Sequence, residues 1–265
     1  MTILTNIKEF TQEWKTDIKN RVAALRHVPT IGIVRIGNNP ASERYVRNKI
    51  KDCQEVGIPA TEYHYDTITQ EEFALLCGRV QLENDFIIVQ QPLPDNLILD
   101  EYMINSEQDI DAFLGANSAF DACTPFGIMY YLRKSVGWQP EGKEVCIIGR
   151  GNLVGKPLAR MMTDANATVT LCHSKSRNLL RHMIDSNLIV SAVGKANFID
   201  AHAVNALNPG VMIIDVGINF DENGKMVGDC YNVTPECNVT PVPGGVGLLT
   251  RCAIMEQAVK MAATW

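Results

Sequence analysis

The stretch CIIGRGNLVGKPLAR, residues 146–160, decides the fold class, because it joins an apolar run to a helical pattern through a turn rich in glycine. Residues 146–148 are typical of the end of a buried strand, and residues 154–162 are typical of a helix. The turn between them holds its glycines at positions 149, 151 and 155. Such a turn lets backbone N–H groups and the start of a helix approach a phosphate closely. The spacing is G-x-G-x-x-x-G rather than the usual G-x-G-x-x-G, so a tight structural turn is the alternative interpretation.

The segments around this turn favour the phosphate-binding interpretation. Apolar strands are expected at residues 144–149, 167–173, 187–193 and 210–217, with helical segments between the first three. This is the layout of a Rossmann-like dinucleotide-binding domain, in which the phosphate lies at the turn after the first strand.

The N-terminal part of the chain also alternates strands and helices. The pattern predicts a helix at about 6–27, strands at 30–37, 61–66 and 85–94, and helices at 42–56 and 70–80. This β-α-β-α-β order implies a second parallel sheet with crossover helices. We therefore predict an α/β protein of two domains, residues 1–120 and 121–247. A last amphipathic helix, within residues 248–265, is expected to return to the first domain.

The end of the second strand of the dinucleotide-binding pattern indicates which cofactor is bound. An NAD site usually presents Asp or Glu there to the ribose hydroxyls. This chain instead has Ser174, Lys175 and Arg177, with Arg150 in the glycine turn. A cationic pocket with a hydroxyl group suits a 2′-phosphate, which favours NADP. A solvated basic loop is the alternative for Lys175 and Arg177.

The bulk composition excludes several classes of protein. The 265 residues carry a formal net charge of −6, and no run rich in lysine or arginine suggests nucleic-acid binding. We find neither a signal peptide nor an apolar stretch long enough for a membrane span. The 8 cysteines form no C-x-x-C pair, so a reducing cytoplasm fits better than a disulfide framework. The 5 histidines are dispersed, and we expect no metal site.

Polar residues in the N-terminal domain are candidates for a second half of the site. Tyr45 and Lys49 lie four residues apart, on one face of the predicted helix, although most lysines are merely solvated. Gln90 and Gln91 end a strand, where their amides could reach into a cleft. Gln90 by itself is more easily explained without a function.

Two further segments are open to two interpretations. Asp109 and Asp111, in DIDAF, follow an apolar stretch, and acids at such a place are most often turn or cap residues. The loop PVPGGVG, residues 241–247, has a backbone that could approach a flat ligand, and it could equally be a plain connection between domains.

Taken together and in order, these segments resemble the bifunctional methylenetetrahydrofolate dehydrogenase/cyclohydrolase family. The matching stretches are PASERYVRNKIKDCQEVGI, VQQPLP, DIDAF, CTPFG, GRGNLVGKP, ATVTLCHSKS, AVGKANFI, IDVGIN and TPVPGGVGLLT. They cover nearly the whole chain, and the Y-x-x-x-K and PVPGGVG elements in register are highly specific.

The resemblance implies an enzyme of folate-linked one-carbon metabolism. Its first reaction passes a hydride from 5,10-methylenetetrahydrofolate to NADP⁺. Its second adds water to the methenyl cation and opens the ring to give 10-formyltetrahydrofolate. Residues 1–120 with the helix of 248–265 would then bind folate, residues 121–247 would bind NADP, and the chain would form a homodimer. Neither nucleic acid nor a membrane is an expected partner.

The resemblance also assigns roles to individual residues. Lys49 is the catalytic lysine, Tyr45 packs against the folate, Gln90 positions the lysine and Asp111 grips the pterin. The substrate-binding residues are Tyr45, Lys49, Val89, Gln90, Gln91, Asp111, Pro243, Gly244, Gly245, Val246 and Gly247. The cofactor-binding residues are Gly149, Arg150, Gly151, Ser174, Lys175, Ile218 and Thr250.

The chain departs from the family pattern at a few positions near these residues. Gly151 stands where the family usually has Ser, and Ala112 stands where it usually has Gly. The segment between Phe113 and Cys123 is also shorter than in the family. Two alternatives to the bifunctional enzyme follow: a dehydrogenase with weak or absent cyclohydrolase activity, and a folate- or NADP-binding protein without turnover.

Overall fold

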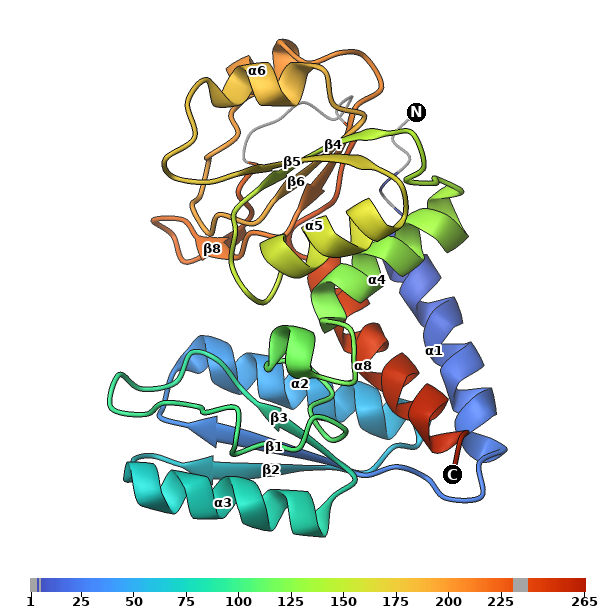
Figure 1. Cartoon of the computed structure of the whole chain (residues 1–265), viewed down its shortest axis with the longest axis vertical. Coiled ribbons are helices and arrows are strands. Elements are labelled where there is room, and N and C mark those ends of the chain that lie inside the picture. The colour runs from blue at the N-terminus through green and yellow to red at the C-terminus, as the bar shows by residue number, and fades with distance from the viewer. Residues whose placement is uncertain (1–3, 5, 231–237) are drawn as a thin grey trace. The chain divides into compact units, whose positions relative to one another are not determined.

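The computed structural model describes residues 4, 6–230 and 238–265, and it divides into two compact units (Figure 1). The three-stranded unit consists of Glu13–Cys123 and Arg251–Trp265. The five-stranded unit consists of the described residues up to Gln12 and those of Thr124–Thr250. The helices α1 (Ile7–Ala23) and α8 (Val246–Ala262) each contribute several residues to both units.

The three-stranded unit is built on a parallel sheet of order β2-β1-β3. Its strands are β1 (Ile31–Ile36), β2 (Ala60–Tyr65) and β3 (Phe86–Val89). The helices α2 (Pro40–Val56) and α3 (Gln70–Glu83) connect these strands and lie on opposite faces of the sheet (Figure 1). The expected β-α-β-α-β order and the parallel sheet are therefore confirmed.

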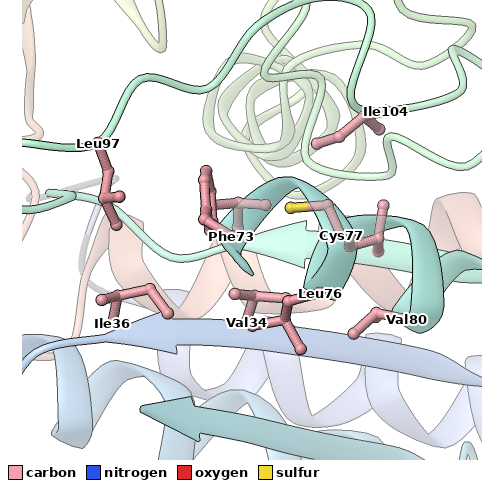
Figure 2. Close-up of a cluster of buried hydrophobic side chains, with 10 residues drawn as sticks. Val34, Ile36, Phe73, Leu76, Cys77, Val80, Leu97 and Ile104 are labelled. Carbon is pink, nitrogen blue, oxygen red and sulfur yellow. The ribbon is translucent and has the colours of Figure 1, made fainter. Parts of the chain in front are cut away.

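The face of the sheet under α3 holds a cluster of buried apolar side chains (Figure 2). A Cβ atom at Gly32 would overlap the Cγ1 atom of Val80, so α3 packs directly on the backbone of β1. Phe73 and Val34 are fully buried there. β1 is a short run of mostly branched apolar residues that is buried along its whole length, which explains why the sequence pattern predicts this strand correctly.

The last helix returns to the three-stranded unit and packs on the first, as predicted, but it is not amphipathic as expected, because its residues 252–259 are all buried. The buried Glu256 of α8 accepts hydrogen bonds from Nε1 of Trp14 at 2.9 Å and from Nη1 of Arg21 at 3.2 Å. Burial raises the pKa of the Glu256 carboxyl, but the hydrogen bonds from Arg21 and Trp14 lower it more, so the net shift is downward. The pair of Arg21 and Glu256 lies within an otherwise apolar contact, so it fixes which face of α8 packs against α1.

The five-stranded unit is a parallel sheet of order β10-β7-β6-β4-β5. Its strands are β4 (Glu144–Ile148), β5 (Thr168–Cys172), β6 (Leu188–Ser191), β7 (Met212–Asp215) and β10 (Asn238–Val239). The chain runs from β4 outward to β5 and then returns to the other side of β4 to form β6. The strand order therefore reverses beside β4, and ligands of such sheets bind at the carboxyl ends of the strands at this switch point.

Shorter elements complete the five-stranded unit. They are α4 (Cys123–Tyr131), a π-helical turn (Leu132–Val136), α5 (Gly155–Asp164), α6 (Leu179–Ile184), α7 (Ala201–Asn205), β8 (Asn219–Phe220) and β9 (Met226–Val227). A 3₁₀ turn (Gly115–Asn117) belongs to the other unit. Within the described ranges, no helix is long and apolar enough to cross a membrane.

Candidate functional site

A buried lysine of the three-stranded unit is held by a carboxylate that remains partly accessible. Nζ of Lys49 lies 3.1 Å from Oδ2 of Asp111, and the two side chains are 7% and 31% exposed. A buried ammonium group needs such a partner, because an unpaired charge is costly in a medium of low dielectric. The accessible carboxylate can also accept hydrogen bonds from a ligand, since two oxygens offer about four acceptor positions.

A bridge to β3 fixes the start of the segment that carries Asp111. Asp109 forms a parallel bridge with Ile87 of β3, and Asp111 follows in a turn that the N–H of Ala112 closes by donating to the carbonyl of Asp109 at 2.9 Å. Lys49 is on α2, one turn after Tyr45. The sheet thus brings together two residues that are 62 positions apart in the chain.

The two acids of DIDAF have different roles in the structure. Asp109 is 1% exposed, and its carboxylate accepts the backbone N–H groups of Phe113 at 3.0 Å and Leu114 at 2.8 Å. Burial raises the pKa of the Asp109 carboxyl, although these hydrogen bonds oppose the shift. Asp109 is therefore a turn residue, as the alternative interpretation predicted, whereas Asp111 pairs with Lys49. Ala112, the residue directly after Asp111, has a φ of 52°, a left-handed conformation that favours glycine.

The side-chain amides of Gln90 and Gln91, which follow β3, hold buried polar atoms. Gln90 donates from Nε2 to the carbonyl of Gln91 at 2.7 Å. No residue that the structure describes forms a hydrogen bond with the buried Oε1 of Gln90 or the buried Nε2 of Gln91. Such atoms need explanation in a native protein, and a bound polar ligand would satisfy them. Among the described residues, Gln90 makes no hydrogen bond to Lys49.

Tyr45 lies beside a charged network at the same helix. Its side chain is half-buried, and burial raises the pKa of its hydroxyl while Arg251 opposes the shift. Arg251 of α8 forms an ion pair with Asp52 of α2, which Lys15 also approaches at 3.4 Å. The C-terminal helix therefore contributes a cation to the surroundings of Tyr45, which the sequence did not predict.

A second residue of α8 fixes the segment that carries Asp111. Nε2 of the buried Gln257 donates to the carbonyl of Asp121 at 2.9 Å and to Sγ of Cys123 at 3.1 Å. The thiol of Cys123 in turn donates to the carbonyl of Ile110 at 3.2 Å. Burial raises the pKa of Cys123 well above its usual value, so this thiol is neutral. A polar residue within an apolar C-terminal helix was the only sequence signal for this role.

The glycine turn of the five-stranded unit follows β4 at the switch point. Gly149 has a φ of 112°, and a Cβ atom there would overlap the carbonyl of Ala192, the residue after β6. A Cβ atom at Gly155 would overlap the carbonyl of Gly149, so the turn and the start of α5 pack backbone on backbone. A Cβ atom at Gly151 would meet nothing within 4 Å. Two of these glycines are therefore required by packing, and the third is not.

The start of α5 and the charges around it suit an anion. Within the described chain, no side chain caps the N-terminus of this ten-residue helix. Arg150 in the turn is exposed, as are Ser174 and Lys175 beyond β5. The backbone N–H of Lys175 donates to Nδ1 of His173 at 3.1 Å, which shapes this loop. The side chain of Lys175 is exposed, so its ammonium group is accessible to an anion.

The remaining predicted residues also lie in the five-stranded unit. Ile218, after β7, is 39% exposed. Thr250 shares a hydrogen bond of 2.9 Å with the hydroxyl of Thr124. The loop of residues 243–247 joins β10 to α8, and its Val246 and Gly247 form the first turn of that helix. The structure describes no group of three His, Cys, Asp or Glu side chains that could hold a metal ion.

Comparison with protein families gives one match for each half of the chain. Residues 5–111 match the catalytic domain of tetrahydrofolate dehydrogenase/cyclohydrolase. Residues 122–264 match the NAD(P)-binding domain of the same enzymes. The two matches meet close to the point where the chain passes from the three-stranded to the five-stranded unit.

Individual relatives align with the chain from end to end. Bifunctional protein FolD of Campylobacter hominis is 39% identical over 276 residues, which covers 96% of this chain and 95% of its own. The crystal structure of the bifunctional enzyme FolD from Campylobacter jejuni has a TM-score of 0.89 at 36% identity and covers 98% of both chains. The structure of the Trypanosoma brucei enzyme, complexed with NADP cofactor and inhibitor, has a TM-score of 0.86 at 26% identity. It covers 97% of this chain and 96% of its own.

Proposed function

This chain belongs to the tetrahydrofolate dehydrogenase/cyclohydrolase family, and on that premise we propose how its residues carry out the two reactions. It is a bifunctional enzyme of folate-linked one-carbon metabolism. It oxidises 5,10-methylenetetrahydrofolate to the methenyl compound and hydrolyses that product to 10-formyltetrahydrofolate. The observation that carries the assignment of residues is the buried Lys49, held 3.1 Å from the accessible Asp111.

We propose that Lys49 moves the proton in the hydrolytic reaction. Addition of water to a methenyl carbon requires removal of a proton from the water as the bond forms. Lys49 is the buried group beside an accessible carboxylate, so its amine is held in place and shielded from bulk solvent. Gln90 supports the lysine in this proposal, and Tyr45, one helical turn away, packs against the folate.

We propose that Asp111 and the end of β3 bind the pterin. A carboxylate can accept two adjacent N–H groups of a pterin edge while it stays paired with a lysine. The unpartnered Oε1 of Gln90 and Nε2 of Gln91 supply one acceptor and one donor beside Val89. We assign the loop of Pro243, Gly244, Gly245, Val246 and Gly247 to folate binding as well, on the family resemblance.

The residues of the five-stranded unit fit an NADP molecule. The glycine turn and the uncapped N-terminus of α5 suit a pyrophosphate, and the exposed Arg150 and Lys175 suit a 2′-phosphate. When bound, NADP⁺ supplies the hydride acceptor of the oxidation. The Trypanosoma brucei relative was crystallised with NADP, which supports NADP over NAD for this chain. Gly149, Gly151, Ser174, Ile218 and Thr250 complete the proposed contacts.

The two halves of the chain then have separate tasks. We propose that residues 1–120, with the helix of 248–265, bind folate, and that residues 121–247 bind NADP. A homodimer through the five-stranded unit is proposed from the family resemblance, and light scattering during size-exclusion chromatography tests it. The seven described cysteines are free thiols, six of them buried, which supports a cytoplasmic location.

One absorbance experiment tests the proposed function. The purified chain is mixed with methylenetetrahydrofolate and either NADP⁺ or NAD⁺, and NADPH and methenyl absorbance are followed. We expect NADPH to form with preference over NADH, and methenyltetrahydrofolate to decay faster with the enzyme than without it. Oxidation without accelerated hydrolysis would support the dehydrogenase alternative. Binding without either reaction would identify a binding protein instead.

A further inference from the structure

A buried aspartate of the five-stranded unit gathers hydrogen-bond donors from two loops. Asp229 is completely buried, and its Oδ2 atom accepts from Oγ of Ser191 at 2.8 Å and from the backbone N–H of Val193 at 2.8 Å. The N–H of Gly194 also donates to Oδ2, at 3.3 Å, and the N–H of Lys195 donates to Oδ1, at 2.9 Å. Three consecutive N–H groups thus converge on one carboxylate, as they do in an anion-binding nest.

The same carboxylate reaches the loop after β7. Its Oδ1 atom accepts from Nδ2 of Asn219 at 3.1 Å. Asn219 follows Ile218, which we propose contacts the cofactor. Asp229 therefore connects the loop after β6 with the segment after β7, at the carboxyl edge of the sheet.

A second buried aspartate holds the first in place. Asp215, the last residue of β7, accepts the N–H groups of Gly217 at 2.9 Å, Asp229 at 3.0 Å and Cys230 at 2.8 Å. Its own N–H donates to Oγ1 of Thr240 at 2.8 Å. The backbone around Asp229 is therefore anchored to the end of a core strand.

The surrounding backbone is shaped to admit these two carboxylates. A Cβ atom at Gly217 would overlap Oδ1 of Asp229, and a Cβ atom at Gly228 would overlap Oδ2 of Asp215. Neither glycine has a positive φ, so space rather than conformation requires them. Within the part of the chain that the structure describes, neither aspartate forms an ion pair, and polar donors alone compensate their charges.

The loop that Asp229 holds lies directly against the glycine turn. Ala192 donates its N–H to the carbonyl of Ile148, the last residue of β4, at 2.8 Å. Its carbonyl occupies the place where a Cβ atom of Gly149 would stand. A shift of the loop after β6 would therefore displace the turn, because the two backbones are in contact.

We propose that Asp229 is a positioning residue of the NADP site: its carboxylate fixes the loop of residues 192–195 and the segment around Ile218 in the form that receives the cofactor. This inference rests on the proposed function, which places NADP at the glycine turn and at Ile218. Asp229 touches no reacting atom in this account. It acts through the backbone that it holds.

The test compares two Asp→Asn variants of the five-stranded unit. Asp229→Asn replaces one acceptor oxygen with an NH₂ group that faces backbone donors. Asp221→Asn is the matched control, because Asp221 accepts the N–H groups of Asn223 and Lys225 at 2.9 Å in a partly exposed turn, where Asn serves equally well. Fluorescence titration gives the Kd for NADPH, steady-state assays give KM for NADP⁺ and for methylenetetrahydrofolate, and circular dichroism reports folding.

We expect Asp229→Asn to weaken NADPH binding and raise KM for NADP⁺ by at least about tenfold, the scale of one hydrogen bond to a charged group. The KM of Asp229→Asn for methylenetetrahydrofolate should stay at the wild-type value. The Kd of Asp221→Asn for NADPH and its KM for NADP⁺ should also stay there. A folded Asp229→Asn variant with wild-type NADPH affinity would overturn the positioning role. Failure of the wild-type chain to bind NADPH would instead contradict the proposed function.

A milder pair of variants decides the question if Asp229→Asn does not fold. Ser191→Ala and Asn219→Ala each remove one donor from the Asp229 carboxylate and leave the charge in place. Each should raise the Kd for NADPH by about threefold, and the double variant by about tenfold. Unchanged affinity in the folded double variant would contradict the proposal.

Discussion

Each unit buries a pair of charged side chains, but the two pairs are opposite in construction. Lys49 and Asp111 carry opposite charges, and Asp111 remains 31% exposed. Asp215 and Asp229 carry like charges, are sealed from solvent and are surrounded by N–H and O–H donors of the protein itself. A pair with an accessible member can share it with a ligand, whereas a carboxylate saturated by protein donors can only hold backbone in place. Burial of a charge therefore does not by itself identify a reacting group.

The largest effect on the two reactions together is expected from neutralising the accessible member of the first pair. Asp111→Asn removes the counter-charge of Lys49 and the proposed acceptor of the pterin N–H groups. We expect kcat/KM of both reactions to fall by about 10²-fold, since hydrogen bonds to a charged group contribute about 1.5–3 kcal/mol each. Steady-state assays of both activities measure this.

The exposed Asp95 provides the control for this substitution. Asp95→Asn has the same change in charge and should leave both activities at the wild-type level. If Asp111→Asn kept full activity, the accessible pair would not be part of the site, and the contrast between the two pairs would lose its functional meaning.

Arg150 extends the comparison to a charge that is fully available to a ligand. Its side chain is exposed in the glycine turn, unlike the two sealed aspartates of the same unit. Arg150→Ala should weaken the binding of NADP⁺ by about 1.5–3 kcal/mol and the binding of NAD⁺ far less, because only NADP⁺ carries the 2′-phosphate. Isothermal titration with both cofactors measures the difference. Equal weakening of the two would show that Arg150 does not bind the 2′-phosphate.

The sealed pair predicts a dependence of stability on pH. Burial, and to a lesser degree Asp229, raises the pKa of Asp215 to about 6, against the effect of its backbone hydrogen bonds. The folded state therefore binds the proton of the Asp215 carboxyl more tightly than the unfolded state does. Protonation of Asp215 stabilises the folded state increasingly as the pH falls below about 6, and this stabilisation is lost as the pH rises through about 6. Asp215→Asn removes it. The free energy of unfolding of the wild type relative to this variant should rise by about 2 kcal/mol from pH 7.5 to 4.5.

Chemical unfolding of both proteins at several pH values checks this prediction. Asp221→Asn again serves as the control and should follow the wild type, because its carboxylate is partly exposed. A wild-type minus Asp215→Asn difference that stays constant across this pH range would contradict the raised pKa.

The smallest effect concerns the backbone next to Asp111. Ala112 has a φ of 52°, a conformation that costs a non-glycine residue about 1–2 kcal/mol. Ala112→Gly relieves this cost but loses a buried methyl group, worth about 0.8 kcal/mol. We expect it to destabilise the protein by at least about 1 kcal/mol less than Ala122→Gly, a buried alanine without a positive φ. Thermal unfolding compares the two variants, and equal losses would remove the argument for strain at Ala112.

Much of the architecture could be predicted from periodicity. The apolar runs of β1 and β3, the length of the connecting helices and the glycines after β4 predicted both parallel sheets and the sheet edge where we propose that the cofactor binds. The return of α8 to the first unit was also predicted. The short α7, between β6 and β7, was not expected, because its five residues carry too little helical pattern.

Partners distant in sequence could not be predicted. Nothing in DIDAF distinguishes Asp109 from Asp111, since only the bridge between Ile87 and Asp109 decides which acid turns inward. Asp215 left a signal, an acid at the end of a buried strand, but Asp229 follows no periodic segment at all. Their roles depend on loops that meet only in the folded unit.

The measurement that tests the central claim most directly is the rate of methenyltetrahydrofolate hydrolysis by Lys49→Met. Methionine keeps most of the aliphatic stem and removes the amine, so the fold and the Kd for NADPH should persist. We predict that the hydrolysis rate falls by at least about 10²-fold, the usual scale of general acid–base catalysis, and that oxidation falls less. Hydrolysis at the wild-type rate by the folded variant would contradict the assignment of Lys49.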